Sequence, residues 1–182
     1  MQFIKTRDVK DPIRNPKENA GIDFFIPEAT PEFIIDFLKK NPTYEKVDEA
    51  LPETAIVLCG VITKEGRIFI PPHEAVIIPT GIKSKFGPEL ALIANNKSGI
   101  ATKKQLIFGA SVIDCSYQGE WHINLINTSN KIQTIECGTK AVQFIPHLIS
   151  TEPVEIIDLP EEEFYTEKTS RGEGWQGSTG LK

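Results

Sequence analysis

The sequence has 182 residues, a formal net charge of −5 and 40% hydrophobic residues, which fits one domain, or one domain with an insertion, that can build a core. An acidic balance argues against a nucleic-acid surface, because the phosphate backbone requires a basic one. No stretch resembles a signal peptide or a membrane-spanning helix, and three scattered cysteines fit reduced thiols. We therefore expect a cytoplasmic protein, in the host cytoplasm if it is viral, that is not secreted and contacts neither nucleic acid nor a membrane.

Short strands separated by turn residues make up most of the predicted elements. In chain order the expected strands are residues 2–6, 20–26, 55–63, 67–70, 75–79, 81–86, 89–94, 106–108, 121–127, 134–136, 141–146 and 154–159. Lys64-Glu65-Gly66 is typical of the turn of a hairpin. Many short strands of this kind predict an all-β sandwich, jelly roll or barrel.

Residues 29–53 interrupt the β pattern with a predicted helical insertion. Thr30 before Pro31 is typical of an N-cap followed by proline in the first helical turn, and Asn41-Pro42 ends the helix. The apolar residues that share one helical face are Phe33, Ile34, Phe37 and Leu38. We expect residues 44–50 to add a further turn, and we interpret the insertion as peripheral and available to a protein partner or to the rim of an oligomer.

The stretch from Gly109 to Glu120 carries the most distinctive chemistry. Hydrophobic residues lead into Asp114, and Tyr117 follows three positions later. Gly119 then closes what reads as a hairpin with the strand 121–127. A carboxylate at a strand end beside a turn is fixed yet reachable from solvent, which suits a general base. An ordinary turn with an exposed aspartate fits the same residues, so both interpretations stay open here.

Three further segments combine polar side chains with small residues. Lys97-Ser98-Gly99 follows a strong strand and offers a hydroxyl and backbone N–H groups to an anion, but it equally fits a plain helix N-cap. Gln143 lies within an apolar strand, either as a satisfied buried amide or as a donor to phosphate. Asp23 follows Ala20-Gly21 and fits either a turn or a residue near a metal.

The C-terminal segment, residues 167–182, is polar and glycine-rich and cannot pack a core alone. Its Gly172-x-Gly174-x-x-Gly177 spacing matches the dinucleotide fingerprint in letters, but no βαβ pattern surrounds it. Arg171, with the hydroxyls and small residues that follow, suits a polyphosphate, and a disordered tail is the alternative. We expect a single β domain over residues 1–166 and a flexible lid over residues 167–182.

Taken together and in this order, the segments resemble the five motifs of the trimeric all-β dUTP nucleotidohydrolases (dUTPases). The matching stretches are Ala20-Gly21-Ile22-Asp23-Phe24, Lys97-Ser98-Gly99-Ile100-Ala101, Val112-Ile113-Asp114 with Tyr117-Gln118-Gly119, Gly138-Thr139-Lys140-Ala141-Val142-Gln143, and Arg171 to Gly180. The resemblance implies a jelly-roll-like β-barrel that forms a homotrimer, with a short helix after the second motif. It also implies hydrolysis of dUTP to dUMP and pyrophosphate with Mg²⁺, which keeps uracil out of DNA and supplies dUMP for dTMP synthesis.

The resemblance also implies a role for each matched residue. Asp114 would activate the water that attacks the α-phosphorus, and Tyr117 would lie under the deoxyribose. Mg²⁺ would be held by the substrate's phosphates, with Asp23 near it through water. The other implied substrate-binding residues are Lys97, Ser98, Gly99 and Gln143 at the phosphates, Phe108, Val112, Ile113 and His122 at uracil, and Arg171, Trp175, Gln176, Gly177, Ser178 and Thr179 in the lid.

Some residues depart from the family pattern. Lys97 and Lys140 stand where the family has arginine, so a point charge replaces a bidentate fork. Trp175-Gln176 replaces Gly-Phe, which shifts the lid aromatic by one position. One alternative function is that of the dCTP deaminases of the same fold, but Asn124 stands where they use a glutamate, and an amide cannot shuttle that proton. The other is a dUTP-binding regulatory protein that acts through the insertion.

Overall fold

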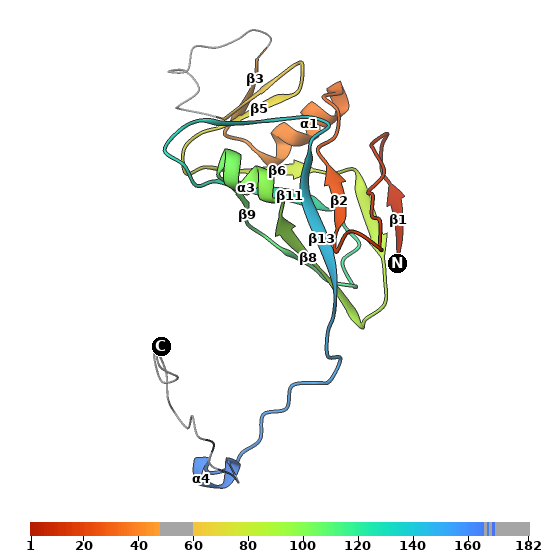
Figure 1. The fold of residues 1–182 in the computed structure, drawn as a ribbon, viewed down its shortest axis with the longest axis vertical. Coiled ribbons are helices and arrows are strands. Elements are labelled where there is room, and N and C mark those ends of the chain that lie inside the picture. Colours follow the sequence, from red (N-terminus) through yellow and green to blue (C-terminus); the bar gives the residue numbers. More distant parts are fainter. Residues whose placement is uncertain (48–59, 166, 168, 170–182) are drawn as a thin grey trace. The chain divides into compact units, whose positions relative to one another are not determined.

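The computed structural model describes residues 1–47, 60–165, 167 and 169, and the chain divides into two compact units, Met1–Thr151 and Glu152–Lys182. The first unit is mostly β structure (Figure 1). Its strands are β1 (Gln2–Lys5), β2 (Ile22–Phe25), β3 (Tyr44–Val47), β4 (Gly60–Thr63), β5 (Arg67–Ile70), β6 (Ala75–Pro79), β7 (Ile82–Lys85), β8 (Leu90–Asn96), β9 (Leu106–Phe108), β10 (Val112–Ile113), β11 (His122–Asn127), β12 (Gln133–Glu136) and β13 (Lys140–Leu148). Its described helices are α1 (Pro31–Lys40) and α3 (Ser98–Lys104).

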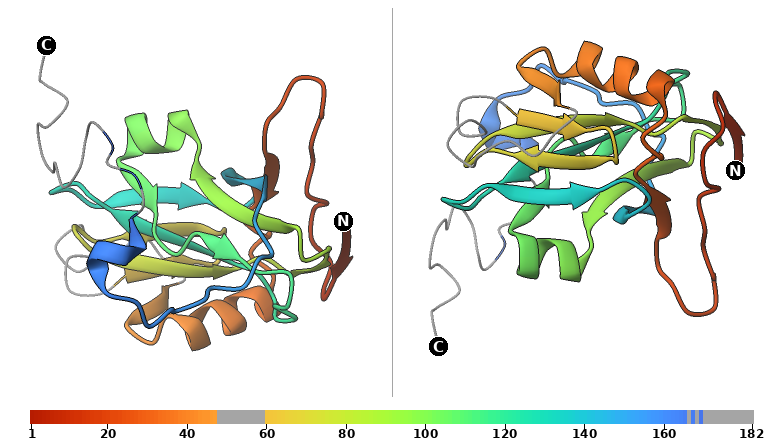
Figure 2. Two further views of the ribbon diagram at one scale, coloured as in Figure 1. Left: turned by 90° about the horizontal axis from the view of Figure 1, so that it is seen from below. Right: turned by 90° about the horizontal axis from the view of Figure 1, so that it is seen from above.

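The strands form four hydrogen-bonded ladders with the orders β10-β8-β13-β2, β6-β11-β9, β12-β5-β4-β3 and β1-β7. Neighbouring strands are antiparallel except for β3 and β4. Figure 2 shows the ladders stacked in layers, with α1 and α3 on opposite sides. This arrangement confirms the predicted all-β, jelly-roll-like class, although the ladders of the described residues do not close into one continuous barrel.

One hydrophobic core lies between the layers, and its centre is aromatic. Along β11 the side chains alternate between buried and half-buried positions, as a strand between a core and a second face requires. Trp121 is fully buried, stacks on Phe24 with 5.0 Å between ring centroids and lies 4.7 Å from the ring of Phe144. Phe24 on β2 and Phe144 on β13 each directly follow a polar residue of a predicted motif. Because both rings pack against Trp121, the core holds these two strands, and with them the two polar residues, in fixed positions.

The insertion helix α1 is part of the core and is not peripheral, contrary to our expectation. Its start is as predicted, because Thr30 Oγ1 accepts the Phe33 N–H at 3.2 Å. Phe33 and Phe37 are both 0% exposed. The side chain of Asn41 accepts the Ile77 N–H at 2.8 Å and donates to the Ile77 carbonyl at 2.7 Å. The insertion thus covers the edge of the β6 ladder, which would otherwise expose unpaired backbone groups.

Residues 44–47 form strand β3, so the predicted further helical turn is wrong there. Tyr44 lies opposite Gly60 in the parallel β3-β4 pair. A Cβ atom at Gly60 would come within 2.1 Å of the Tyr44 ring, so only glycine leaves room for it. Tyr44 also packs edge-on against Phe37 at 5.5 Å. Pairing with β4 has therefore outweighed local helix propensity in residues 44–47. Residues 48–50 of the predicted turn and residues 55–59 of the next predicted strand lie outside the described residues.

The Asp114 stretch is a connection between two ladders, not the hairpin that we predicted. Val112 in β10 pairs with Ile93 in β8, whereas β11 pairs with β6 and β9. β10 therefore forms its backbone pairing with β8. The Ala94 N–H of β8 also donates to the carbonyl of Ser111, the residue just before β10, at 2.7 Å. The chain must therefore cross from one ladder to the other between Asp114 and β11.

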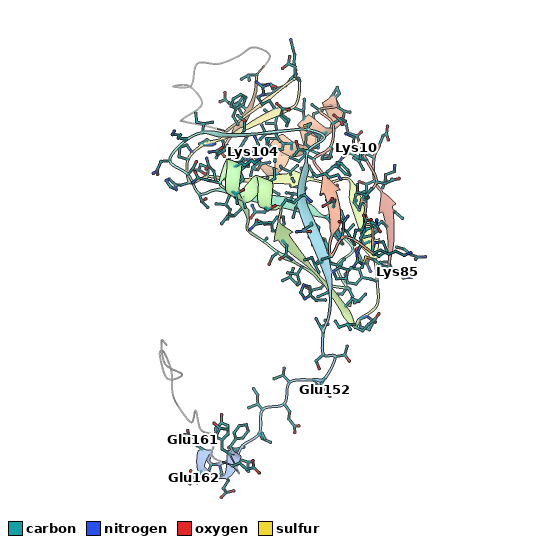
Figure 3. All side chains as sticks on the ribbon, viewed as in Figure 1. Lys10, Lys85, Lys104, Glu152, Glu161 and Glu162 are labelled. Atoms are coloured by element: carbon teal, nitrogen blue, oxygen red, sulfur yellow. The ribbon has the colours of Figure 1, made fainter. Side chains whose placement is uncertain are left out.

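The second unit contains the helix α4 (Glu161–Phe164). The strand predicted over residues 154–159 is not formed, and Val154 and Ile156 are 94% and 95% exposed. An isolated extended segment has no partner for its backbone groups, so it cannot form a ladder alone. Figure 3 labels three acidic side chains of this unit, Glu152, Glu161 and Glu162. No helix of the described residues is long and apolar enough to span a membrane.

Candidate functional site

A basic cluster forms at one end of the β8-β13-β2 ladder. Asp23 on β2 and Gln143 on β13 are direct cross-strand partners. The Asp23 carboxylate, 13% exposed, lies 2.6 Å from Lys97 Nζ and 3.5 Å from Lys140 Nζ. Two ammonium groups around one carboxylate leave the cluster with a net charge of +1. The cluster can therefore attract an anion, and its attraction is strengthened where water is partly excluded.

Small residues and free backbone donors surround this cluster. A Cβ atom at Gly21 would come within 2.8 Å of Gln143 Oε1, so glycine lets the β2 turn approach the amide. The Gln143 amide donates to the Asn96 carbonyl at 3.3 Å, so it has a hydrogen-bond partner within the chain. Its side chain is only half-buried, so a ligand can also contact it. The first-turn N–H groups of α3, at the exposed residues Ser98 and Gly99, have no intrahelical acceptor. Lys97, the N-cap residue, makes no side-chain capping bond, so its ammonium serves Asp23.

A second group of predicted residues lies on the connection after β10. Asp114 is exposed and directly follows the strand, and its carbonyl accepts the Tyr117 N–H at 3.1 Å. The Tyr117 hydroxyl donates to the Glu120 carbonyl at 2.9 Å. A Cβ atom at Gly119 would come within 2.3 Å of that hydroxyl. The Tyr117 ring therefore folds back over Gly119 and is held at both ends, beside a carboxylate that solvent can reach.

The two groups lie apart within this chain. Ile113 pairs with Leu92, whereas Gln143 pairs with Asn95, three residues farther along β8. At about 3.3 Å per residue this is about 10 Å along the strands, and the step from β10 to β2 adds three strand spacings, or about 14 Å. One copy of the chain therefore does not bring Asp114 into contact with the cluster around Asp23.

The residues expected at uracil are partly engaged already. The Phe108 N–H donates to Asn96 Oδ1 at 2.6 Å, so this donor is used within the chain. Val112 is 56% exposed, while the half-buried Ile113 has its backbone in the β10-β8 pair. His122 is half-buried at the start of β11.

Asn124 holds the segment between β9 and β10 in place. Its Oδ1 atom accepts the Ala110 N–H at 3.1 Å, its carbonyl accepts the Gly109 N–H at 3.0 Å and its Nδ2 atom donates to the Val76 carbonyl at 3.3 Å. A Cβ atom at Gly109 would come within 2.0 Å of Asn124 Oδ1, so glycine is required for this approach. The amide therefore has a structural role at the position where the deaminase alternative needs an acid.

An ion network at this connection was not predicted from the sequence. Arg7, whose side chain is 7% exposed, binds Asp36 of α1 at 3.0 Å and also binds Glu120. The Gly81 N–H donates to Glu120 Oε1 at 2.7 Å. No sequence spacing relates Arg7 to a partner 113 positions away. The one available signal was an acid directly after the Tyr117-x-Gly119 pattern.

The donor atoms present fit Mg²⁺ only indirectly. Among the described residues, no three His, Cys, Asp or Glu side chains come together as a metal site. Asp23 is the carboxylate of the basic cluster, and both of its oxygens face ammonium groups. Mg²⁺ prefers six oxygen ligands and commonly keeps several waters alongside substrate phosphates. These residues would hold a magnesium ion only together with a phosphorylated ligand that supplies most of the oxygen ligands.

The predicted lid residues lie outside the described part of the chain. These residues are Arg171, Trp175, Gln176, Gly177, Ser178 and Thr179. Their roles, and the boundary between the β domain and the lid, stay predictions.

The pH dependence of stability should report the environment of His122. Burial lowers the pKa of His122, and the nearby Lys40 ammonium lowers it further, while Glu120 opposes the shift. In the unfolded chain the histidine pKa is about 6.5, so His122 is protonated at a higher pH in the unfolded state than in the folded state. Stability is therefore retained above that pH and is lost as the pH falls toward the folded pKa. We expect His122→Asn to unfold with a smaller loss of stability than wild type between about pH 7.5 and 5, measured by urea titration; equal losses would contradict this.

Comparisons with known proteins identify the family that this chain resembles. A family model described as dUTPase matches residues 61–180. The deoxyuridine 5'-triphosphate nucleotidohydrolase of Haemophilus ducreyi is 31% identical over 144 residues, which are 76% of this chain and 86% of that protein. Its counterpart in Oryza sativa subsp. japonica is 32% identical over 122 residues, which are 66% of this chain and 63% of that protein.

Solved dUTPase structures share the fold. A mutant dUTPase of Staphylococcus bacteriophage 80alpha, solved with dUpNHpp, superposes with a TM-score of 0.67 at 17% identity and covers 99% of this chain and 98% of that one. A mutant dUTPase from phage phi11 of S. aureus, which coordinates a structural Mg(II) ion, has a TM-score of 0.59 at 18% identity and covers 88% and 97%. Because the family model matches more than half of its residues and a relative with 31% identity is covered over 86% of its length, the chain belongs to the dUTPase family.

Proposed function

We propose that this chain hydrolyses dUTP to dUMP and pyrophosphate. The observation that carries the proposal is the exposed carboxylate of Asp114, fixed at the end of β10 beside a tyrosine ring held in place. Family membership gives the reaction class, and the basic cluster around Asp23 and Lys97 offers charge for a triphosphate. The reaction would keep uracil out of DNA and supply dUMP for dTMP synthesis.

Asp114 would act as the general base. Its carboxylate accepts a proton from a water molecule as the water oxygen bonds to the α-phosphorus. The bond from the α-phosphorus to the bridging oxygen breaks, and its electron pair leaves with pyrophosphate. Such a displacement needs mainly positioning and neutralisation of charge from the protein. Mg²⁺, when bound by the phosphates, would supply further charge neutralisation there.

The basic cluster would hold the phosphates. Lys97 and Lys140 can stay beside Asp23 and also donate to phosphate oxygens, because each ammonium group carries three N–H donors on a flexible stem. Gln143 and the backbone N–H groups at Ser98 and Gly99 can donate to the same oxygens. Asp23 would then orient the two ammonium groups, and would reach the metal only through water.

Tyr117 would select the sugar. Because its hydroxyl is bound to Glu120 and its ring lies over Gly119, the ring cannot easily move to admit a 2′-hydroxyl. Uracil would be read by backbone groups near Val112, Ile113 and His122. The Phe108 N–H is a poorer candidate than we expected, since it already binds Asn96.

Complete sites would form between subunits of a homotrimer. The distance between Asp114 and the Asp23 cluster within one chain supports this arrangement, because a single triphosphate must reach both the water held by Asp114 and the cluster that binds its oxygens. The exposed apolar residues Val154 and Ile156 offer a surface that another copy could cover. The lid residues Arg171, Ser178 and Thr179 would close on the outer phosphates, with Trp175 as the aromatic above uracil.

The proposed function is tested by measuring pyrophosphate release from dUTP, dTTP, UTP and dCTP, with Mg²⁺ and with the ion chelated. We expect rapid turnover of dUTP alone, and a strong loss on chelation. Comparable rates for all four nucleotides would contradict the proposal. Ammonia release from dCTP would favour a deaminase, and tight dUTP binding without turnover would favour a regulatory protein.

A further inference from the structure

We propose that Arg7 is a positioning residue for Tyr117, and so helps to determine the choice between deoxyribose and ribose. The contact chain runs from Arg7 through Glu120 to the tyrosine hydroxyl. This inference rests on the proposed dUTP hydrolysis, because it assigns to Tyr117 the sugar-binding role described above.

The first step is the anchoring of the Glu120 side chain. Its carboxylate receives the Arg7 guanidinium and the Gly81 N–H, the latter at 2.7 Å. Arg7 is only 7% exposed at its side chain, so the pair is largely removed from water. Such a pair is strongly oriented, and removing one partner leaves the other as an uncompensated charge. Without Arg7, the carboxylate would tend to turn toward solvent.

The second step links that side chain to the tyrosine. The Glu120 carbonyl accepts the Tyr117 hydroxyl at 2.9 Å. The N–H of the same peptide unit, at Trp121, donates to the Ile82 carbonyl at 2.9 Å. Because a peptide unit is planar, bonds at its two ends and at the Glu120 side chain leave it one orientation. A shift of Glu120 would therefore move the acceptor that holds the Tyr117 ring.

The third step connects the inserted helix to the same network. Arg7 Nη1 lies 3.0 Å from Asp36 Oδ2 on α1, and Asp36 Oδ1 lies 3.6 Å from Lys39 Nζ. α1 is held by its buried phenylalanines, so Asp36 presents a fixed second carboxylate to the guanidinium. Arg7 Nε is buried without a partner among the described residues, so the arginine depends on these two carboxylates for its pairing.

The test compares kcat/KM for dUTP and for UTP in wild type, Arg7→Gln, Arg7→Lys and Glu120→Gln. Both substrates meet the same folded fraction of enzyme, so the ratio of the two values is insensitive to loss of stability. We expect Arg7→Gln and Glu120→Gln to lower the dUTP/UTP ratio by roughly tenfold, with KM for dUTP raised more than kcat is lowered. Arg7→Lys, which restores a cation, should recover part of the ratio.

Two further variants sharpen the comparison. Tyr117→Phe removes the same anchor, so its effect on the ratio should not add to that of Glu120→Gln in a double-mutant cycle. Glu136→Gln makes the same chemical change in a carboxylate that pairs with Arg67 at 3.5 Å on another ladder, and should leave the ratio unchanged. Ratios within twofold of wild type in both Arg7→Gln and Glu120→Gln, or full additivity in the cycle, would overturn the inference.

A measurement without substrate separates this inference from the proposed function. The chain has three tyrosines, so 3-fluorotyrosine labelling gives few fluorine resonances, and Tyr117→Phe assigns the one of interest. We expect that resonance to shift and narrow in Glu120→Gln, as the ring gains motion, and to stay in place in Glu136→Gln. A wild-type protein that does not turn over dUTP would end the proposed function, while an unchanged resonance in Glu120→Gln would end this one. Glu120→Gln preserves shape, so it decides the question even where Arg7→Gln does not fold.

Discussion

Replacing Asp114 with asparagine is expected to lower kcat for dUTP by roughly 10²–10⁴-fold, the usual contribution of a positioned general base. The amide has nearly the same shape as the carboxylate but cannot take a proton from water. Asp114 is exposed at the end of β10, and the bond described there, from the Tyr117 N–H, goes to its main-chain carbonyl. The substitution should therefore leave the fold and the binding of dUTP intact. Pyrophosphate release and equilibrium binding of dUpNHpp would measure the two quantities separately.

A matched control is available at Asp11, another exposed acid, which pairs with Lys5 at 3.0 Å. Asp11→Asn makes the same chemical change outside the candidate site and should keep wild-type turnover. Near-normal kcat in Asp114→Asn would remove this residue from the reaction. A loss of dUTP binding as large as the loss of kcat would instead indicate that the carboxylate serves to bind substrate.

Truncation of a buried side chain of the insertion helix is expected to lower the stability of the fold strongly. Phe37 is 0% exposed, with its ring 6.0 Å from Phe33 and 5.5 Å from Tyr44. Phe37→Ala removes a buried aromatic side chain and leaves a cavity, which typically costs about 3–5 kcal/mol of unfolding free energy. Urea unfolding at one fixed protein concentration would measure the change, since association also contributes to apparent stability.

The same helix provides the control for this prediction. Ile35 is 55% exposed, so Ile35→Ala should change the free energy of unfolding by less than about 0.5 kcal/mol. If Phe37→Ala were equally mild, α1 would be the peripheral element that the sequence suggested. The stronger effect means that deleting residues 29–53 would damage the fold, so a deletion cannot show whether the insertion serves a partner.

Local patterns were sufficient where each element depends on residues close to it in the chain. The N-cap at Thr30 was predictable because its acceptor and donor are three residues apart. The turn at Gly66 was predictable because a tight turn often needs a residue with positive φ, which glycine adopts most easily, and Gly66 has a φ of 85°. The ordered motifs likewise identified the family, which the family model confirms, whereas the roles that they assign to Asp114, Tyr117 and Asp23 stay predictions.

Only the tertiary structure decided features that depend on distant partners. Residues 44–47 became a strand because Gly60 accepts the Tyr44 ring, and the insertion became core because β6 needed an edge partner. Asp23 proved to be paired with two lysines, and Arg7 to be buried between acids from different elements. The physical reason is the same in each case: burial and charge pairing are set by which chain segments meet in space. The spacing of residues in a single sequence does not indicate which distant segments come into contact.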